Sequence, residues 1–274
     1  MAKLFRKLLP FGSPRGQRPP APWWVGFLLI FGLGMIFSPW LRYQVLSLIE
    51  YPLHYKEYKH FGIRIPNGYA VHGIDVSRYQ RRVDWERVSK MKVEDVRISF
   101  AFIKATEGSW MKDPEFERNW ENARDNKIVR GAYHFFLPDV SPRDQAVNFI
   151  KNVRLQSGDL PPVVDVEERR GMSRDQVRRA TLAFIAILEK KYGVKPIVYT
   201  NRDFYKNHFA NQPEFKPYCF WIAHYHVSDL DMPDDSKWHF WQHSDRGRVN
   251  GINEPVDFNV FYGDLATLQR MCVP

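Results

Sequence analysis

Short apolar runs alternate with amphipathic stretches between about residues 70 and 200. The apolar runs are AVHGIDVS (70–77), ISFAFIKAT (98–106), VRGAYHFF (129–136), PPVVDVE (161–167) and PIVYTN (196–201). We predict that each run forms a strand, and that helices lie around residues 85–90, 114–127, 142–153 and 174–192. This alternation is typical of parallel strands connected by helices.

The helix over 174–192 has the clearest boundaries. Ser173 can cap its first turn and Gln176 stands three residues further on, which completes a capping-box pattern. Apolar positions then recur at helical spacing, and Gly193 follows as a stop signal.

The pattern changes after residue 200. CFWIAHY (219–225), WHFWQHS (238–244) and VDFNVFY (256–262) have the composition of strands, but no further long helix separates them. About eight strands within roughly 200 residues favour a barrel of the βα type whose last part contains few helices.

The N-terminal region has a different character. Residues 23–41 form an apolar stretch of roughly 19 residues, about the length of one bilayer crossing. Residues 1–22 contain five basic residues and no acidic one. The positive-inside tendency therefore predicts a cytoplasmic tail (1–22), a single transmembrane anchor (23–41), a juxtamembrane stalk (42–69) and an extracytoplasmic barrel (70–274). A cleaved signal peptide is the alternative, although no clear cleavage site follows the apolar run.

The charge of the chain argues against nucleic acid as a partner. The net charge is +9, of which the basic tail supplies five. The remaining excess is diffuse, so the chain lacks the concentrated basic stripe of a nucleic-acid-binding protein. Cys219 and Cys272 lie in the exported part, where a disulfide is permitted, but their spacing does not decide whether they pair.

Acidic residues at the ends of predicted strands are the strongest chemical signal. Asp165 and Glu167 end an apolar strand and point to the same side of it, because side chains alternate along a strand. Two close carboxyl groups can divide the roles of proton donor and ionised stabiliser in glycoside cleavage. Solvation, or pairing with Arg169 and Arg170, is the alternative for an isolated pair. Asp75 and Asp257 also lie in strand-like segments, and strand ends converge at one mouth of a barrel.

Seven motifs in order carry a resemblance to a known family. They are GIDVS (73–77), FIKATEG (102–108), GAYHF (131–135), DVE (165–167), YTN (199–201), WIA (221–223) and WQ (241–242). Together they resemble the lysozymes, or N-acetylmuramidases, of glycoside hydrolase family 25. The resemblance implies an α/β fold, a flattened (β/α)5(β)3 TIM-like barrel, that hydrolyses the β-1,4 bond between N-acetylmuramic acid and N-acetylglucosamine in peptidoglycan.

The resemblance also implies roles for individual residues. Glu167 matches the general acid/base, and Asp165 the nucleophile or stabiliser of an oxazolinium ion. Asp75 and Asp257 match further active-site acids, and Tyr133 an active-site tyrosine. Four weaker positions, Tyr199, Trp221, Trp241 and Gln242, are predicted to contact substrate, with core packing as the alternative for the aromatic ones. Glu107 is predicted to contact sugar or, equally, to pair with a neighbouring lysine.

Other functions remain open at this stage. A barrel that binds wall glycan without cutting it, or a chitinase-like glycosidase, would also fit several of these residues. His224 and His226, with His239 and His243, suggest a zinc site, but no carboxylate or cysteine recurs at ligand spacing. We therefore expect no metal and no cofactor.

Overall fold

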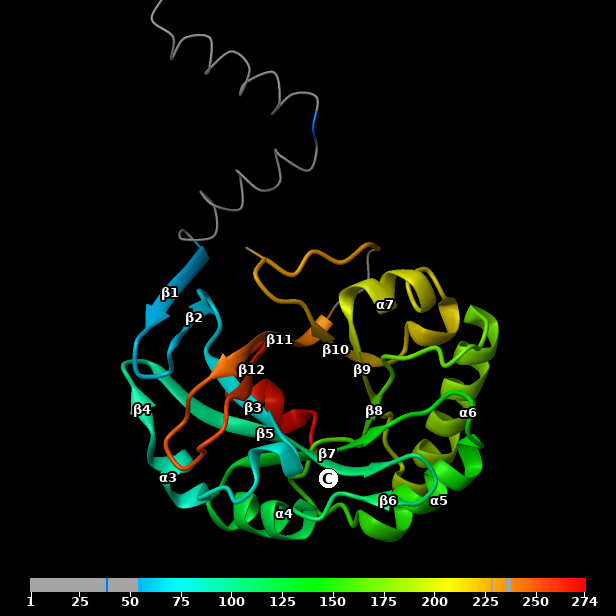
Figure 1. The fold of residues 1–274 in the computed structure, drawn as a ribbon, viewed down its shortest axis with the longest axis horizontal. Helices are drawn as coiled ribbons and strands as arrows, with labels where there is room; N and C mark the ends of the chain where they lie inside the picture. The colour runs from blue at the N-terminus through cyan, green and yellow to red at the C-terminus, as the bar shows by residue number, and fades with distance from the viewer. Residues whose placement is uncertain (1–37, 39–53, 228, 235–237) are drawn as a thin grey trace, which may run out of the picture. The chain divides into compact units, whose positions relative to one another are not determined.

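The computed structural model of the protein describes residues 38, 54–227, 229–234 and 238–274 (Figure 1). The predicted cytoplasmic tail and the predicted membrane anchor lie outside the described residues, except for Ser38. Within the part of the chain that the structure describes, no helix combines the length and the apolar character needed to span a bilayer.

Eight strands form a closed barrel (Figure 1). They are β3 (Val71–Val76), β5 (Val96–Glu107), β7 (Val129–Phe135), β8 (Val163–Asp165), β9 (Ile197–Asn201), β10 (Cys219–Ala223), β11 (Trp238–Gly247) and β12 (Val256–Phe261). Neighbouring strands are parallel except around β12, which runs antiparallel to both β11 and β3. Pairing of β3 with β5 closes the ring. Two short strands, β4 (Lys92–Val93) and β6 (Met111–Lys112), pair antiparallel with the first and last residues of β5.

Five α-helices alternate with the first strands of the barrel. They are α3 (Trp85–Lys90), α4 (Phe116–Asp125), α5 (Pro142–Asn152), α6 (Arg174–Tyr192) and α7 (Arg202–His208). A last helix, α8 (Leu265–Arg270), follows β12, and two 3₁₀ turns, η1 (Arg78–Gln80) and η2 (Pro213–Phe215), complete the elements. The predicted barrel, with few helices in its last part, is confirmed.

Local sequence signals account for the best-defined helix. Ser173 accepts a hydrogen bond from the backbone of Gln176, whose side chain bonds back to Ser173, so the predicted capping box is present. Gly193 closes the helix with a φ of 72°, a left-handed conformation that glycine adopts without strain.

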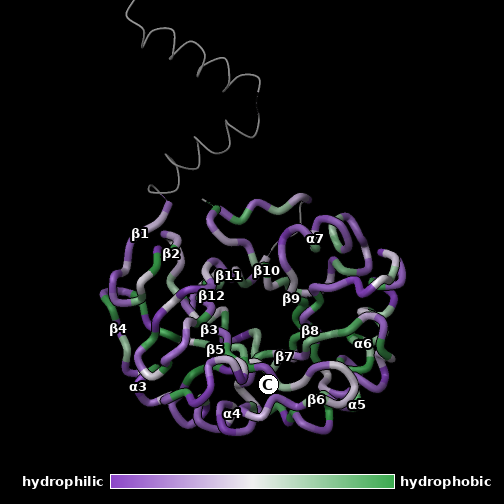
Figure 2. The backbone as a smooth tube through the Cα atoms, viewed as in Figure 1, coloured by the Kyte–Doolittle hydropathy of each residue, from purple (hydrophilic) through white to green (hydrophobic). Residues whose placement is uncertain are grey.

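Two hydrophobic regions lie on opposite sides of the barrel wall. Outward-facing strand residues pack beneath the helices, and Figure 2 shows the strands as largely hydrophobic and the peripheral connections as largely hydrophilic. Inward-facing residues fill the barrel itself, and Phe100, Phe102, Trp221 and Phe240 are among them. The rings of Phe102 and Trp221 stack with centroids 4.2 Å apart. The lower barrel is therefore a packed core, and only its upper end is free for chemistry.

An N-terminal hairpin departs from the predicted stalk. β1 (Tyr55–Tyr58) and β2 (Ile63–Pro66) pair antiparallel, and their apolar side chains are buried in the outer core. The ring of Phe61, in the turn, lies 5.1 Å from that of Phe258 on β12. From residue 54 onward, the segment predicted as stalk therefore belongs to the folded unit. Its strands have four residues each, too few for a clear periodic pattern in the sequence.

Position 73 requires glycine, because the ring of Phe100 packs directly against its backbone. A Cβ added at Gly73 would lie 2.5 Å from the ring of Phe100. We predict that Gly73→Ala lowers the free energy of unfolding by about 1 to 3 kcal/mol, the typical cost of overpacking. Urea denaturation measures the change. In a Phe100→Leu background the same substitution should cost less, and equal costs in both backgrounds would contradict the proposed contact.

Candidate active site

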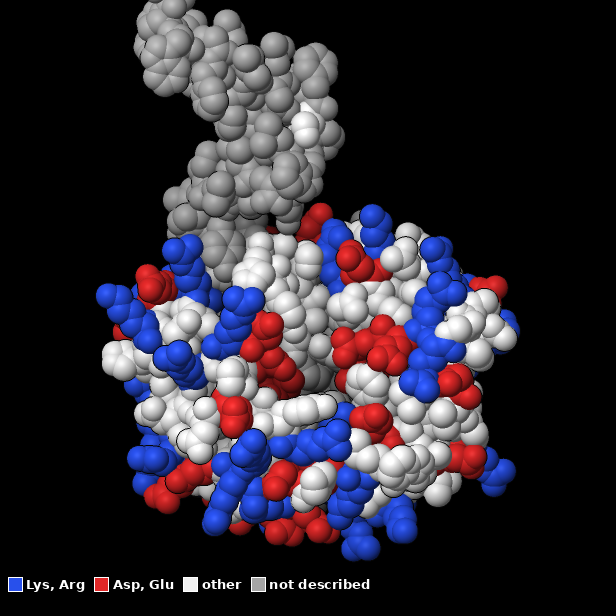
Figure 3. All heavy atoms as spheres, viewed as in Figure 1, with Lys and Arg blue, Asp and Glu red and all other residues white. Residues whose placement is uncertain are grey.

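A layer of polar side chains lies above the packed interior, at the C-terminal ends of the parallel strands. The inward positions of β5 show the change from apolar to polar side chains, because Phe100 and Phe102 are followed by Lys104. This layer opens into a cleft of about 400 Å³. Its charged lining residues are Asp75, Lys104, Asp165, Glu167, Asp245 and Asp257. Figure 3 shows acidic side chains on both sides of the central hollow.

Asp165 and Glu167 enter the cleft from the end of β8. Asp165 pairs in register with Phe135 of β7 and Tyr199 of β9, and it is 4% exposed. The backbone beyond it is fixed too, because Val166 donates to the Tyr199 carbonyl over 3.0 Å. Glu167, one residue beyond Val166, is only half-buried. The deeper acid is therefore held rigidly, and the shallower one faces open space.

Neither acid is neutralised by arginine. Arg170 forms ion pairs with Asp139 and Glu168, and Arg169 donates to the Met172 carbonyl. The Oδ1 atom of Asp165 is buried and has no hydrogen-bond partner. Asp165 and Glu167 therefore do not form ion pairs with Arg169 and Arg170, which was the alternative.

Burial and mutual repulsion control the protonation of this pair. Burial, followed by the charge of Glu167, raises the pKa of Asp165 well above its usual range. Burial also raises the pKa of Glu167, which a hydrogen bond with Asp165 partly opposes. Two carboxylates that interact this closely cannot both ionise easily, which favours a state in which the pair shares one proton.

Asp75 and Asp257 form a second acidic pair across the antiparallel junction of β3 and β12. They lie directly opposite each other in the register. Burial, with the charge of Asp75 next, raises the pKa of Asp257 to about 9. The two carboxyl groups share a hydrogen bond. At neutral pH Asp257 is therefore protonated and donates to the Asp75 carboxylate.

Asp75 is further held by two side-chain amides. Gln242 Nε2 and Asn259 Nδ2 each donate to Asp75 Oδ2 over 2.8 Å. The amide oxygens are fixed in turn: Tyr199 and Tyr225 donate to Gln242 Oε1, and Trp221 Nε1 donates to Asn259 Oδ1. This network orients the amide donors toward Asp75. Burial raises the pKa of Asp75, and the hydrogen bonds from Asn259 and Gln242 oppose that rise.

Lys104 is the single cation among the residues that line this cleft. Its ammonium lies 2.7 Å from Glu107 and 4.9 Å from the ring centre of Phe135. Its charge lowers the pKa values of Asp165 and Glu167, against the larger effect of burial. The basic group thus moderates the negative potential of the acids.

Most of the predicted site residues meet in this cleft. The predicted members that line it are Asp75, Tyr133, Asp165, Glu167, Tyr199, Trp221, Gln242 and Asp257. Glu107 pairs with Lys104, which was the alternative reading for that residue.

Trp241 differs from the prediction. It is fully buried in the outer core, and its ring packs edge-on against Tyr55 with centroids 6.3 Å apart. Its Nε1 atom donates to the His224 carbonyl. Because adjacent residues of a strand face opposite ways, Trp241 and Gln242 cannot both face the cleft.

The sequence prediction missed several members of the site. Lys104 and Asn259 could have been found from strand alternation, since they lie two residues from Phe102 and Asp257 and share their inward direction. Tyr225 lies just beyond β10, but it ends the predicted strand 219–225 and alternates with Trp221 and Ala223, so the same signal could have found it.

The histidines and cysteines show no metal site or disulfide. Across the described ranges, no three His, Cys, Asp or Glu side chains are grouped so as to hold a metal ion. Cys219 and Cys272 are free thiols.

The fold and this cleft agree with the comparisons to known proteins. The sequence profile of "Glycosyl hydrolases family 25" matches residues 74–252, more than half of the chain. The chain belongs to this family and is a glycoside hydrolase.

Individual relatives support the same assignment. The chain is 49% identical to "Uncharacterized protein YegX" of Escherichia coli over 78% of each chain. It is 36% identical to "Lysozyme M1" of Streptomyces globisporus, over 73% of this chain and 70% of that protein. The structure of a family 25 glycosyl hydrolase from Bacillus anthracis is similar, with a TM-score of 0.68 and 34% identity over 78% of this chain and 99% of that one.

The raised pKa of Asp257 predicts a pH-dependent stability. Between about pH 4 and 9 the folded protein holds a proton on Asp257 that the unfolded chain has released. The contribution of this group is therefore fully present below about pH 4 and is lost as the pH rises toward 9. Asp257→Asn should remove up to about 1.4 kcal/mol per pH unit from the slope. Urea unfolding of both proteins between pH 5 and 8 measures this, and parallel curves would contradict it.

Proposed function

We propose that the protein hydrolyses the β-1,4 bond between N-acetylmuramic acid and N-acetylglucosamine in peptidoglycan. The main support is that Asp165 and Glu167 enter one open cleft beside Asp75 and Asp257. No arginine is among the residues that line this cleft. Family membership and similarity to a protein named lysozyme support the same substrate class.

Glu167 acts as the general acid/base. It is the less buried member of the pair, so it can reach the glycosidic oxygen of a bound strand. When the shared proton is on Glu167, Asp165 is ionised below it. The proton passes to the leaving oxygen, and the Asp165 carboxylate stabilises the positive charge that develops at the sugar, either as nucleophile or through an oxazolinium ion.

Asp75 and Asp257 shape the other wall of the cleft. The raised pKa of Asp257 keeps a proton on the second pair at neutral pH, which limits the repulsion of Asp165 and Glu167. Tyr133, which is only partly buried, supplies apolar and hydrogen-bonding surface for the sugar rings, and Tyr199 and Trp221 belong to the packed interior beneath it.

We further propose that residues 23–41 anchor the enzyme in the cytoplasmic membrane and hold the barrel on the outer side. The support is the apolar length of this segment and the basic residues that precede it.

The catalytic assignment predicts a large loss of activity without a loss of fold. Glu167→Gln should lower kcat about 10² to 10⁴-fold, because the amide cannot donate or accept the catalytic proton. New reducing ends released from purified peptidoglycan by the full chain in detergent measure the rate. Glu168→Gln, an exposed neighbour, is the matched control. Full activity in Glu167→Gln would refute the assignment, and binding without new reducing ends in the wild type would favour a glycan-binding role.

The Lys104 charge predicts the position of the pH optimum. Lys104→Met removes a charge that lowers the pKa values of both Asp165 and Glu167. Both limbs of the kcat/KM profile should therefore shift upward, by about one pH unit. Lys104→Arg keeps the charge and should retain the original optimum. A shift in the opposite direction, or an equal shift in both variants, would contradict this electrostatic role.

A further inference from the structure

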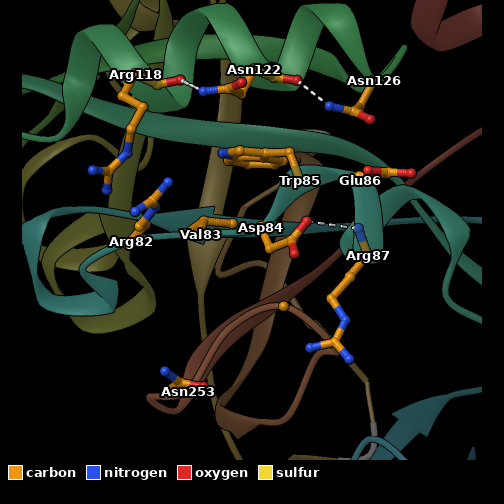
Figure 4. A pocket seen from close by; sticks show the side chains of 11 residues that line it. Arg82, Val83, Asp84, Trp85, Glu86, Arg87, Arg118, Asn122, Asn126 and Asn253 are labelled. Atoms are coloured by element: carbon orange, nitrogen blue, oxygen red, sulfur yellow. Dashed lines mark hydrogen bonds between the residues drawn. The ribbon is translucent and has the colours of Figure 1, made fainter.

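A second pocket lies on the outer side of the barrel, between α3, α4 and the connection before β12 (Figure 4). Its volume, about 630 Å³, exceeds that of the catalytic cleft. The polar lining residues are Arg82, Asp84, Glu86, Arg87, Arg118, Asn122, Asn126 and Asn253. The backbone of Asp84 donates to the Gly251 carbonyl over 2.9 Å, so two of its walls are joined.

The pocket presents three guanidinium groups, and two carboxylates, Asp84 and Glu86, line it with them. The Asp84 carboxylate caps α3 by accepting from the Arg87 backbone, and Glu86 pairs with Lys90. Within the described part of the chain, Arg82 and Arg87 form no ion pair. Figure 4 shows the side chains of Arg82 and Arg118 extending toward one another. Like charges that converge in this way favour an anionic ligand.

The third arginine is only partly satisfied. Arg118 pairs with Glu115 through Nη2, but its Nε atom is buried and has no hydrogen-bond partner. A planar guanidinium donates two parallel hydrogen bonds to a carboxylate, so the arginines of this pocket match carboxylate groups.

Nearby residues of one segment line the pocket and the catalytic cleft. Tyr79 and Gln80 line the cleft, and Arg82, two residues further on, lines the pocket. Gln80 donates to the Pro255 carbonyl over 3.0 Å and Arg81 pairs with Glu254, which fastens this segment to the connection that leads to Asp257. The segment of residues 79–82 therefore connects the lining of the cleft with the lining of the pocket.

We propose that this pocket binds the carboxylates of the peptide branch of the glycan strand that occupies the cleft. This inference rests on the proposed function, since the branch starts from a sugar of the scissile strand. The arginines bind the carboxylate groups, and the asparagine amides offer donors and acceptors to a peptide backbone.

The experiment compares two substrates with one enzyme. The full chain in detergent is given peptidoglycan strands with their peptides, and the same strands after enzymatic removal of the peptides. Arg82→Gln, Arg87→Gln and the double variant replace exposed side chains, so the fold should persist. Arg179→Gln, exposed on α6, is the matched control.

We expect kcat/KM for peptide-bearing strands to fall about tenfold in the double variant, while the value for peptide-free strands stays unchanged. Added salt should reduce the wild-type preference for peptide-bearing strands. An equal loss on both substrates, or no loss on either, overturns the inference. The proposed function fails separately, if wild-type protein releases no reducing ends from either substrate. In that case co-sedimentation of the variants with intact and peptide-stripped wall still tests the pocket.

Discussion

Burial of carboxyl groups at the upper end of a packed barrel is the constraint on which the site depends. The aromatic residues that fill the interior exclude water from below, so Asp165 and Asp257 cannot ionise at their ordinary pKa values. Each acid shares its environment with a second one, which leaves each pair with a retained proton. Proton donors near neutral pH are thereby obtained from residue types that are normally ionised.

The remaining polar groups keep these protons in defined places. Burial raises the pKa of Asp75, and the hydrogen bonds that Gln242 and Asn259 donate to it oppose this rise. The oxygen atoms of those amides are fixed by tyrosine and tryptophan donors. The charge of Lys104 opposes the effect of burial on the pKa values of Asp165 and Glu167. Desolvation, hydrogen bonds from amides and the charge of one buried cation thus act together on the pKa values of the four carboxyl groups.

Closure of the barrel brings these groups together from distant parts of the chain. Gln242 contacts Asp75 across 167 sequence positions and Asn259 contacts it across 184. Both contacts exist because β12 runs antiparallel between β11 and β3 and completes the ring. On the outer side of the ring, the pocket lined by Arg82, Arg87 and Arg118 is connected to the cleft by the segment of residues 79–82.

Local sequence patterns predicted the helices with strong caps, the positions of the barrel strands and the convergence of the strand-end acids, because hydrophobic periodicity and capping depend on neighbouring residues only. Its motifs also predicted the family. Tertiary structure alone decided which neighbour on a strand faces the cleft, and it assigned Gln242 to the site and Trp241 to the outer core. It also placed the hairpin of residues 55–66 in the folded unit. Facing and docking depend on register and packing between distant segments, and no local pattern encodes them.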